Sequence, residues 1–292
     1  MLNYLIHLAV IIGIYTILAL SLQLVVGFTG LMNFGHIAFF GIGAYTSTLL
    51  TLSGVTWEFA FASAGAVAAL CGWFLTYGVR KLRGEYLALA TLGFHFVLLS
   101  VLLNWTSLTR GPLGIPGIPR PEVAGVSMQS NFLYLVLVIV LASASAWALA
   151  RITNSRFGKV LAGVRDNEKY LASIGKNTFL VKTKSMACAA FFAGIAGSLF
   201  AHYINFIDPY SFGLQEIILV FTIIIVGGLA SLRGTIKATF LIILIPEMLR
   251  FFSLPSSVLG PMRQMMYAAI LLAILLVRPQ GIEGKVELPP DA

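Results

Sequence analysis

The fold is decided by residues 4–26, which read YLIHLAVIIGIYTILALSLQLVV. A helix needs about 20 mainly apolar residues to cross the hydrocarbon core of a membrane, and this run meets that length. No basic stretch precedes the run, and it is longer than the apolar core of a cleavable signal peptide. We therefore expect it to persist as a membrane helix.

The composition extends this conclusion to the whole chain. Of 292 residues, 59% are hydrophobic and only 10% are charged, whereas a soluble domain carries about 25% charged residues. The predicted fold class is all-α, a polytopic integral membrane protein with about 8–10 transmembrane helices in one domain, residues 1–292. The predicted spans are 4–26, 33–53, 57–79, 86–104, 132–150, 186–206, 217–232, 236–252 and 262–277.

Two hydrophilic stretches separate these spans and give an orientation. Residues 105–131 are so rich in glycine and proline that they exclude a regular helix. Residues 151–185 hold eight Lys or Arg against two acidic residues, so the positive-inside rule places them in the cytoplasm. The other stretch then lies outside. This rule, rather than nucleic-acid binding, explains the net charge of +8. Within the basic loop, residues 160–174 lack proline and predict an amphipathic helix.

Glycines crowd residues 27–46, at positions 27, 30, 35, 41 and 43. This density predicts a broken or re-entrant helix, which a membrane protein tolerates where the segment is buried in protein or lines a cavity. Simple alternation of the spans would place the N-terminus outside. A re-entrant segment would change the parity and place it inside, which is the arrangement we favour.

Polar groups within the spans are costly and must face protein, water or a partner. Glu247 and Arg250 are three residues apart, so on a helix they share one face and form a pair, which either is structural or lines a gate. Gln23 is predicted to form a hydrogen bond between helices. Asp208 and Glu216 flank a turn where we expect them to be solvated.

Two further patterns concern packing and metals. Ala193-x-x-x-Gly197 is a small-xxx-small motif of the kind that brings membrane helices close together. The histidines at positions 36, 95 and 202 lie on different segments without a metal-ligand spacing. We expect structural or pathway roles for them, and no metal site.

Several motifs carry a family resemblance, in order, over nearly the whole chain. They are GLMNFGHIAFFGIGAY (30–45), RGEYLALATLGF (83–94), LTRGPLGIPGIP (108–119), SRFGK (155–159), VRDNE (164–168), ASIG (172–175), FAGIAG (192–197), GG (227–228) and RPQG (278–281). Together they resemble the LivM-type permeases of ABC importers for branched-chain amino acids and related compounds. One departure is GGLASLRGT at 227–235, where Ala230 and Thr235 replace a usual glycine and proline.

The resemblance implies a transport subunit, not an enzyme, in a prokaryotic cytoplasmic (inner) membrane. It implies a second homologous permease, two ABC ATPase subunits that bind the ATP, and an extracytoplasmic solute-binding protein, with no cofactor on this chain. The ATPase-coupling residues implied are Arg156, Gly158, Arg165, Asn167, Glu168, Ala172 and Gly175. An apolar substrate needs a pathway with few charges and some small residues, which fits Asn33, His36, Phe39, Gly41, Tyr45, Thr91 and His95. Plain helix packing also explains the pathway set, and a solvated basic loop also explains the coupling segment.

The sequence leaves two other classes of function open. A stand-alone secondary transporter or facilitator would need an ion-coupling group in the membrane, and Glu247 is the only candidate, with Arg250 placed to neutralise it. An intramembrane enzyme would need convergent catalytic groups, and none is evident. The chain has no phosphate-binding loop of the P-loop type, so any ATP hydrolysis belongs to another chain. The sequence does not separate branched-chain amino acids from urea, amides or other solutes.

Overall fold

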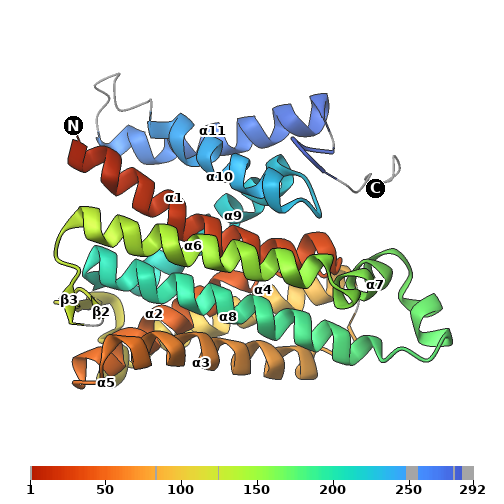
Figure 1. The fold of residues 1–292 in the computed structure, drawn as a ribbon, viewed down its shortest axis with the longest axis horizontal. Helices are drawn as coiled ribbons and strands as arrows, with labels where there is room; N and C mark the ends of the chain where they lie inside the picture. Colours follow the sequence, from red (N-terminus) through yellow and green to blue (C-terminus); the bar gives the residue numbers. More distant parts are fainter. Residues whose placement is uncertain (1, 83, 124, 248–255, 279, 285–292) are drawn as a thin grey trace.

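A computed structural model describes residues 2–82, 84–123, 125–247, 256–278 and 280–284. Its helices form an elongated bundle (Figure 1). Within these ranges, six helical stretches are long and apolar enough to cross a membrane: Leu2–Phe28, Trp57–Gly78, Glu85–Asn104, Asn131–Asn154, Thr178–Ile204 and Pro209–Gly227. Three further apolar helices are α2 (His36–Leu52), α10 (Leu232–Glu247) and α11 (Ser256–Val277). The all-α, polytopic membrane fold class is confirmed.

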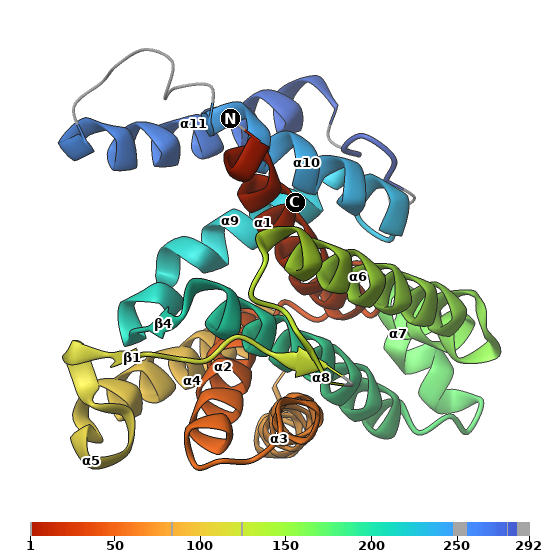
Figure 2. The same cartoon turned by 60° about the vertical axis from the view of Figure 1, so that its left-hand side comes forward.

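The remaining bundle helices are α1 (Leu2–Gln23), α3 (Trp57–Gly78), α4 (Glu85–Asn104), α6 (Asn131–Asn154), α8 (Thr178–Ile204) and α9 (Leu214–Gly227). Figure 2 shows α9, α10 and α11 on one side of α1, with α2, α3 and α4 on the other. The helix α8 starts eight residues earlier than predicted, so Lys182 and Lys184 lie in its first two turns. The cytoplasmic loop is therefore mostly helical.

The helix α8 is the centre of the bundle, where it packs against α1, α2 and α3. Close approach is possible because glycines face each other at the crossing with α2. A Cβ on Gly43 would overlap the backbone of Gly194, and one on Gly197 would overlap the carbonyl of Phe40. The predicted small-residue motif at 193–197 therefore does bring two helices together.

The glycine-rich segment breaks the helix as predicted. After α1 the chain forms one π-helical turn, η1 (Leu24–Phe28), and then leaves helical structure until α2 begins at His36. However, α2 does not turn back, because it runs on to the end of the bundle that carries residues 105–131. There Ser47 of α2 contacts His202, which in turn contacts the carbonyl of Pro119.

This path corrects the placement of the N-terminus. Near the start of α1, the His7 ring lies 2.9 Å from the Tyr203 hydroxyl, and Figure 1 shows the N-terminal end at the same end of the bundle as β2 and β3 of the outer loop. The far end of α1 lies beside the basic loop, where Arg165 contacts Gly27. The favoured cytoplasmic N-terminus is therefore wrong, since α2 crosses to the outside, and simple alternation is correct.

The predicted external loop lacks a long helix, as expected. It contains α5 (Thr106–Thr109), η2 (Gly111–Leu113), β1 (Ile115–Pro116) and the hairpin of β2 (Glu122–Val123) with β3 (Val126–Ser127). The strand β1 pairs in antiparallel fashion with β4 (Phe206–Ile207), which precedes η3 (Pro209–Phe212). The two outer segments thus form one unit.

Candidate coupling helix and translocation region

The candidate coupling helix α7 (Arg156–Ser173) lies at the opposite end from the outer loop (Figure 1). Its start is capped by Ser155, whose hydroxyl oxygen accepts from the backbone N–H of Phe157 (3.1 Å) and Gly158 (3.4 Å). Its end is a Schellman motif: Gly175 has φ +79, and its N–H donates to Ala172 O (3.1 Å) while Lys176 N–H donates to Leu171 O (3.1 Å). The predicted stop at Gly175 is confirmed.

The single helix predicted over residues 160–174 is instead kinked. Asn167 has φ −156 and ψ 88, and its side-chain oxygen accepts from Tyr170 N–H at 2.9 Å. Asparagine therefore caps a second, short helical half, because its side chain competes with the helical backbone for hydrogen bonds. That half is exposed, and it presents Tyr170 (62% exposed) and Ile174 (53%). Both were missed, although apolar residues four apart in a charged helix are a visible signal.

The inner face of α7 is tied to the bundle. Arg165 donates from Nη1 to Gly27 O at 3.0 Å and from Nε to Asp166 Oδ1 at 2.8 Å. Gly30, with φ +73, passes so close that a Cβ there would lie 2.7 Å from Arg165 Cγ. Glu168 pairs with Lys182 of α8 at 2.7 Å. The helix α7 thus contacts both the broken segment and the central helix α8.

These contacts divide the seven predicted coupling residues into two groups. Arg165 and Glu168 point toward the bundle, and Gly158 is buried at the sharp turn between α6 and α7. The exposed group comprises Arg156, Asn167, Ala172 and Gly175. Surface available to another protein is therefore concentrated on the second half of α7 rather than on Arg165.

The predicted pathway residues are all buried, and four of them meet where α2 begins. The Ser21 hydroxyl donates to Leu18 O at 2.7 Å, so at 2.8 Å it accepts from His36 Nε2–H. His36 Nδ1 then accepts from Asn33 at 3.4 Å. Phe39 packs edge-on against His36, and the Thr91 hydroxyl accepts from Phe34 N–H at 3.1 Å. This cluster joins α1, the break, α2 and α4.

The other three pathway residues are separated from that cluster. His95 lies one turn beyond Thr91 on α4, is 1% exposed, and has no hydrogen-bond partner on either ring nitrogen within the described ranges. Gly41 and Tyr45 lie farther along α2 and pack on Phe212 of η3. The Tyr45 hydroxyl also lacks a partner among the residues described.

A chain of hydrogen bonds that the sequence did not reveal links α2 and α8 to the outer loop. His202 Nδ1 donates to Pro119 O at 2.7 Å, and its Nε2 accepts from the Ser47 hydroxyl at 2.9 Å. Ser47 accepts in turn from Ser198 at 2.7 Å. Asn205 Nδ2 adds a donation to Ile118 O at 2.7 Å. The outer loop is therefore fixed to the end of α8.

Two acidic residues differ from expectation. Glu216 is not a solvated residue of an exposed turn: it is half-buried in the first turn of α9 and accepts from the Tyr15 hydroxyl of α1 at 2.6 Å. Asp208 caps η3 by accepting from Ser211 N–H at 2.6 Å.

Glu247 accepts from Tyr4 and pairs with Arg263 of α11 at 2.7 Å. The other half of the predicted pair, Arg250, lies outside the described residues.

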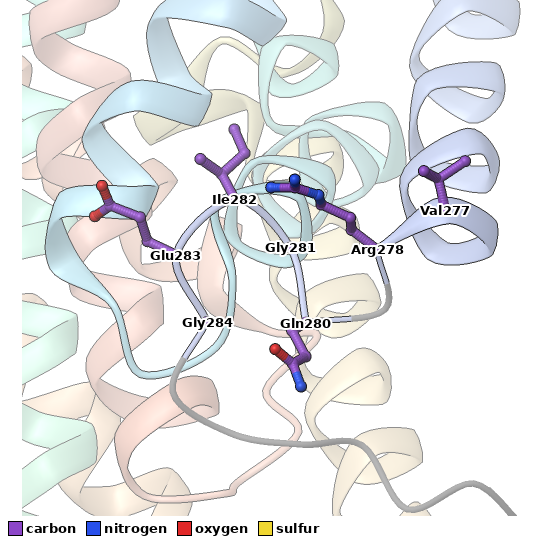
Figure 3. A pocket seen from close by; sticks show the side chains of 7 residues that line it. All are labelled: Val277, Arg278, Gln280, Gly281, Ile282, Glu283 and Gly284. Carbon is purple, nitrogen blue, oxygen red and sulfur yellow. The ribbon is translucent and has the colours of Figure 1, made fainter.

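The two motifs near the C-terminus meet in space. Ile282 N–H donates to Val226 O at 2.9 Å and Glu283 N–H donates to Gly227 O at 3.1 Å, and Lys237 pairs with Glu283. Figure 3 shows the turn of residues 280–284 that makes these contacts, beside a cavity of about 340 Å³. Gln23 of α1 donates to Gly228 O at 2.7 Å, so it links α1 to the loop that follows α9 rather than to another helix directly.

Together, the apolar helices, the broken helix and the cytoplasmic α7 define a multi-pass membrane permease. The family model described as "Branched-chain amino acid transport system / permease component" matches residues 4–275, and the chain belongs to this family. It is therefore a transport protein of the prokaryotic cytoplasmic membrane.

Curated relatives agree. The high-affinity branched-chain amino acid transport permease LivM of Escherichia coli K12 is 33% identical over 95% of this chain and 69% of its own length. The permease LivH of the same strain is 27% identical over 94% of this chain and 92% of its own length. A probable LivM of Methanocaldococcus jannaschii is 23% identical over 95% and 93%. No solved structure matches the chain.

Proposed function

We propose that residues 1–292 form one permease subunit of an ATP-driven importer for branched-chain amino acids or related small solutes. The observation that carries the proposal is α7: its second half is exposed and rigidly capped, while its inner face is tied to the broken helix and to α8. An element of this construction transmits force from a soluble partner into the membrane. Names of relatives that include both LivM and LivH support a second, homologous permease beside this one.

The proposed mechanism follows these contacts. Two ATPase subunits bind and hydrolyse ATP, and one docks on the surface formed by Tyr170 and Ile174. Their closure moves α7, and Arg165 passes that movement to Gly27 at the break between α1 and α2. Because α2 packs on α8 through paired glycines, the two helices move together. The pathway then opens to the other side.

The substrate path is proposed to run along α2 and α4. His95 and Tyr45 support this placement, since buried polar atoms without partners are costly and a passing ammonium or carboxylate group would satisfy them. The soluble binding protein is proposed to deliver substrate at the unit formed by β1, β4 and the residues around Pro119.

Co-purification tests the assembly. The chain, tagged and extracted in mild detergent, should carry a second permease and an ATPase. The assembled complex in liposomes should take up leucine only with ATP inside and binding protein outside. Uptake by this chain alone, driven by an ion gradient or by none, would establish the secondary-transporter alternative. That alternative lacks structural support, because Glu247 already pairs with Arg263.

A further inference from the structure

Beyond transport, one face of the bundle combines an apolar groove with a polar cavity. The groove, of about 270 Å³, lies between α1, α6 and α10, with walls that include Gly13, Ala142, Ala146 and Phe240. The cavity, of about 510 Å³, lies at the cytoplasmic end of α6 and α10. Thr153, Asn154, Ser231, Arg233 and Glu283 provide its polar wall.

The groove leads into the cavity along both helices. On α6, positions 139, 142 and 146 line the groove and positions 150 and 153 line the cavity. Steps of three or four residues place all five on one helix face. On α10, Phe240 and Ile236 line the groove, and Arg233, one turn away, lines the cavity. Figure 2 shows α6 and α10 on the same side of the bundle, next to α1.

The position of Trp147 indicates how deep these features lie. Trp147 is 64% exposed on α6, and the Arg151 guanidinium lies 5.1 Å from its ring centroid. Tryptophan is enriched at the membrane–water interface, so this level marks the cytoplasmic boundary of the hydrocarbon. The groove is then within the hydrocarbon, and the cavity is at headgroup depth. Along α6 the groove runs from Leu135 to Ala146, which is ~16 Å at ~1.5 Å per residue, close to half of the ~30 Å hydrocarbon core.

The charge of the cavity favours an anion. Arg233 is exposed and forms no ion pair with any residue in the described part of the chain, and Asn154 likewise makes no side-chain hydrogen bond there. Glu283, the acidic residue of the wall, is neutralised by Lys237. Basic pockets between membrane helices on the cytoplasmic side bind anionic lipid headgroups.

We propose that this face is a binding site for an anionic phospholipid of the cytoplasmic leaflet. One acyl chain lies in the groove between α1, α6 and α10. The phosphate accepts hydrogen bonds from Arg233 and Asn154. The lipid therefore holds α10 against α6 at the level of the C-terminal turn.

The test compares lipids that share acyl chains and differ in charge. The assembled complex, depleted of lipid by washing in detergent, is placed in nanodiscs of equal phosphatidylglycerol and phosphatidylcholine. It is then re-extracted, and the retained lipids are counted by native mass spectrometry. Wild type should retain phosphatidylglycerol in preference. Arg233→Gln should lower that preference about fivefold. Arg80→Gln is the control and should leave the preference unchanged, because Arg80 is an exposed cation at the cytoplasmic end of α3, away from the cavity.

A second experiment tests the acyl-chain contact by filling the groove with a larger side chain. Ala142→Phe should abolish retention of phosphatidylglycerol, whereas Ala144→Phe, exposed on α6 away from the groove, should not. The proposal would be overturned if each variant and its control retained phosphatidylglycerol equally. It would also be overturned if wild type retained phosphatidylglycerol and phosphatidylcholine without preference. A partner permease seated on this face would overturn it too, seen as a crosslink from Ala142→Cys to the second permease. Labelling of that cysteine by a membrane-soluble maleimide in the assembled complex would support a lipid-facing groove.

Discussion

Arg165→Met is expected to uncouple ATP hydrolysis from transport. Methionine retains part of the alkyl stem that packs against Gly30 but removes the guanidinium that bonds to Gly27 O. The side chain of Arg165 is only 19% exposed, so its bond to Gly27 is largely shielded from water. Movement of α7 would then no longer be transmitted to the break between α1 and α2.

The magnitude follows from the contacts that are lost. A hydrogen bond from a charged donor contributes about 1.5–3 kcal/mol, so we expect the link between α7 and the break to weaken by about 2 kcal/mol. The ion pair to Asp166 adds little, because that carboxylate is 63% exposed and exposed pairs contribute about 0–1 kcal/mol. Since 1.4 kcal/mol is a factor of ten, substrate moved per ATP should fall by more than about tenfold.

The assay measures leucine uptake and phosphate release in the same proteoliposomes. Arg165→Met should hydrolyse ATP with little uptake, Arg165→Lys should recover part of the ratio through one donor to Gly27 O, and Asp166→Asn should resemble wild type. Gly175→Val, which opposes the left-handed φ of +79 at the end of α7, should also lower the ratio. If Arg165→Met keeps the wild-type ratio of uptake to hydrolysis, the proposed route from α7 to Gly27 is refuted.

Three further predictions concern stability, measured as the melting temperature of the purified complex in detergent. Gly43→Ala should lower the melting temperature, because the added methyl group overlaps Gly194 and overpacking costs about 1–3 kcal/mol. Gly93→Ala, which has open space around it, should leave the melting temperature unchanged. Equal melting temperatures for the two variants would contradict the close α2–α8 contact. Ala230→Gly should be neutral or stabilising by up to ~1 kcal/mol, since Ala230 holds φ +60 and a left-handed conformation costs an L-residue about 1–2 kcal/mol; a clear loss would show that its methyl contacts dominate. Tyr15→Phe should cost about 1–3 kcal/mol by leaving the Glu216 carboxylate without its donor, and no change would indicate that Glu216 is hydrated after all.

Features set by local sequence were predictable. Hydropathy located the spans, glycine density located the break before His36, and the glycine at 175 located the end of α7. The small-residue motif in α8 was identified because its spacing is a property of one helix. Even the kink at Asn167 has a local cause, since its side chain caps the following turn, although a proline-free segment gave no warning of it.

Features set by tertiary contacts were not predictable. Glu216 is 201 positions from Tyr15, so its burial depends on α1 lying beside α9, which no local pattern encodes. Arg165 was expected to contact an ATPase, because the family resemblance implies it as a coupling residue. It turns inward because the break in the neighbouring helix leaves the Gly27 carbonyl in need of a donor. The orientation of α2 was likewise decided by its packing on α8.

The helix α8 explains how events at one end of the molecule reach the other. With 27 residues it is ~40 Å long, and both of its ends are fixed by specific bonds. Lys182 is held by Glu168 of α7, and His202 is held by Pro119 of the outer loop. The glycine contacts hold α2 against α8 between these two ends. Residues 29–35 are not helical, so α2 is not a continuation of α1. A push on α7 is therefore expected to move α2, α8 and the outer loop together, so substrate release inside and access for the binding protein outside are changed by the same motion.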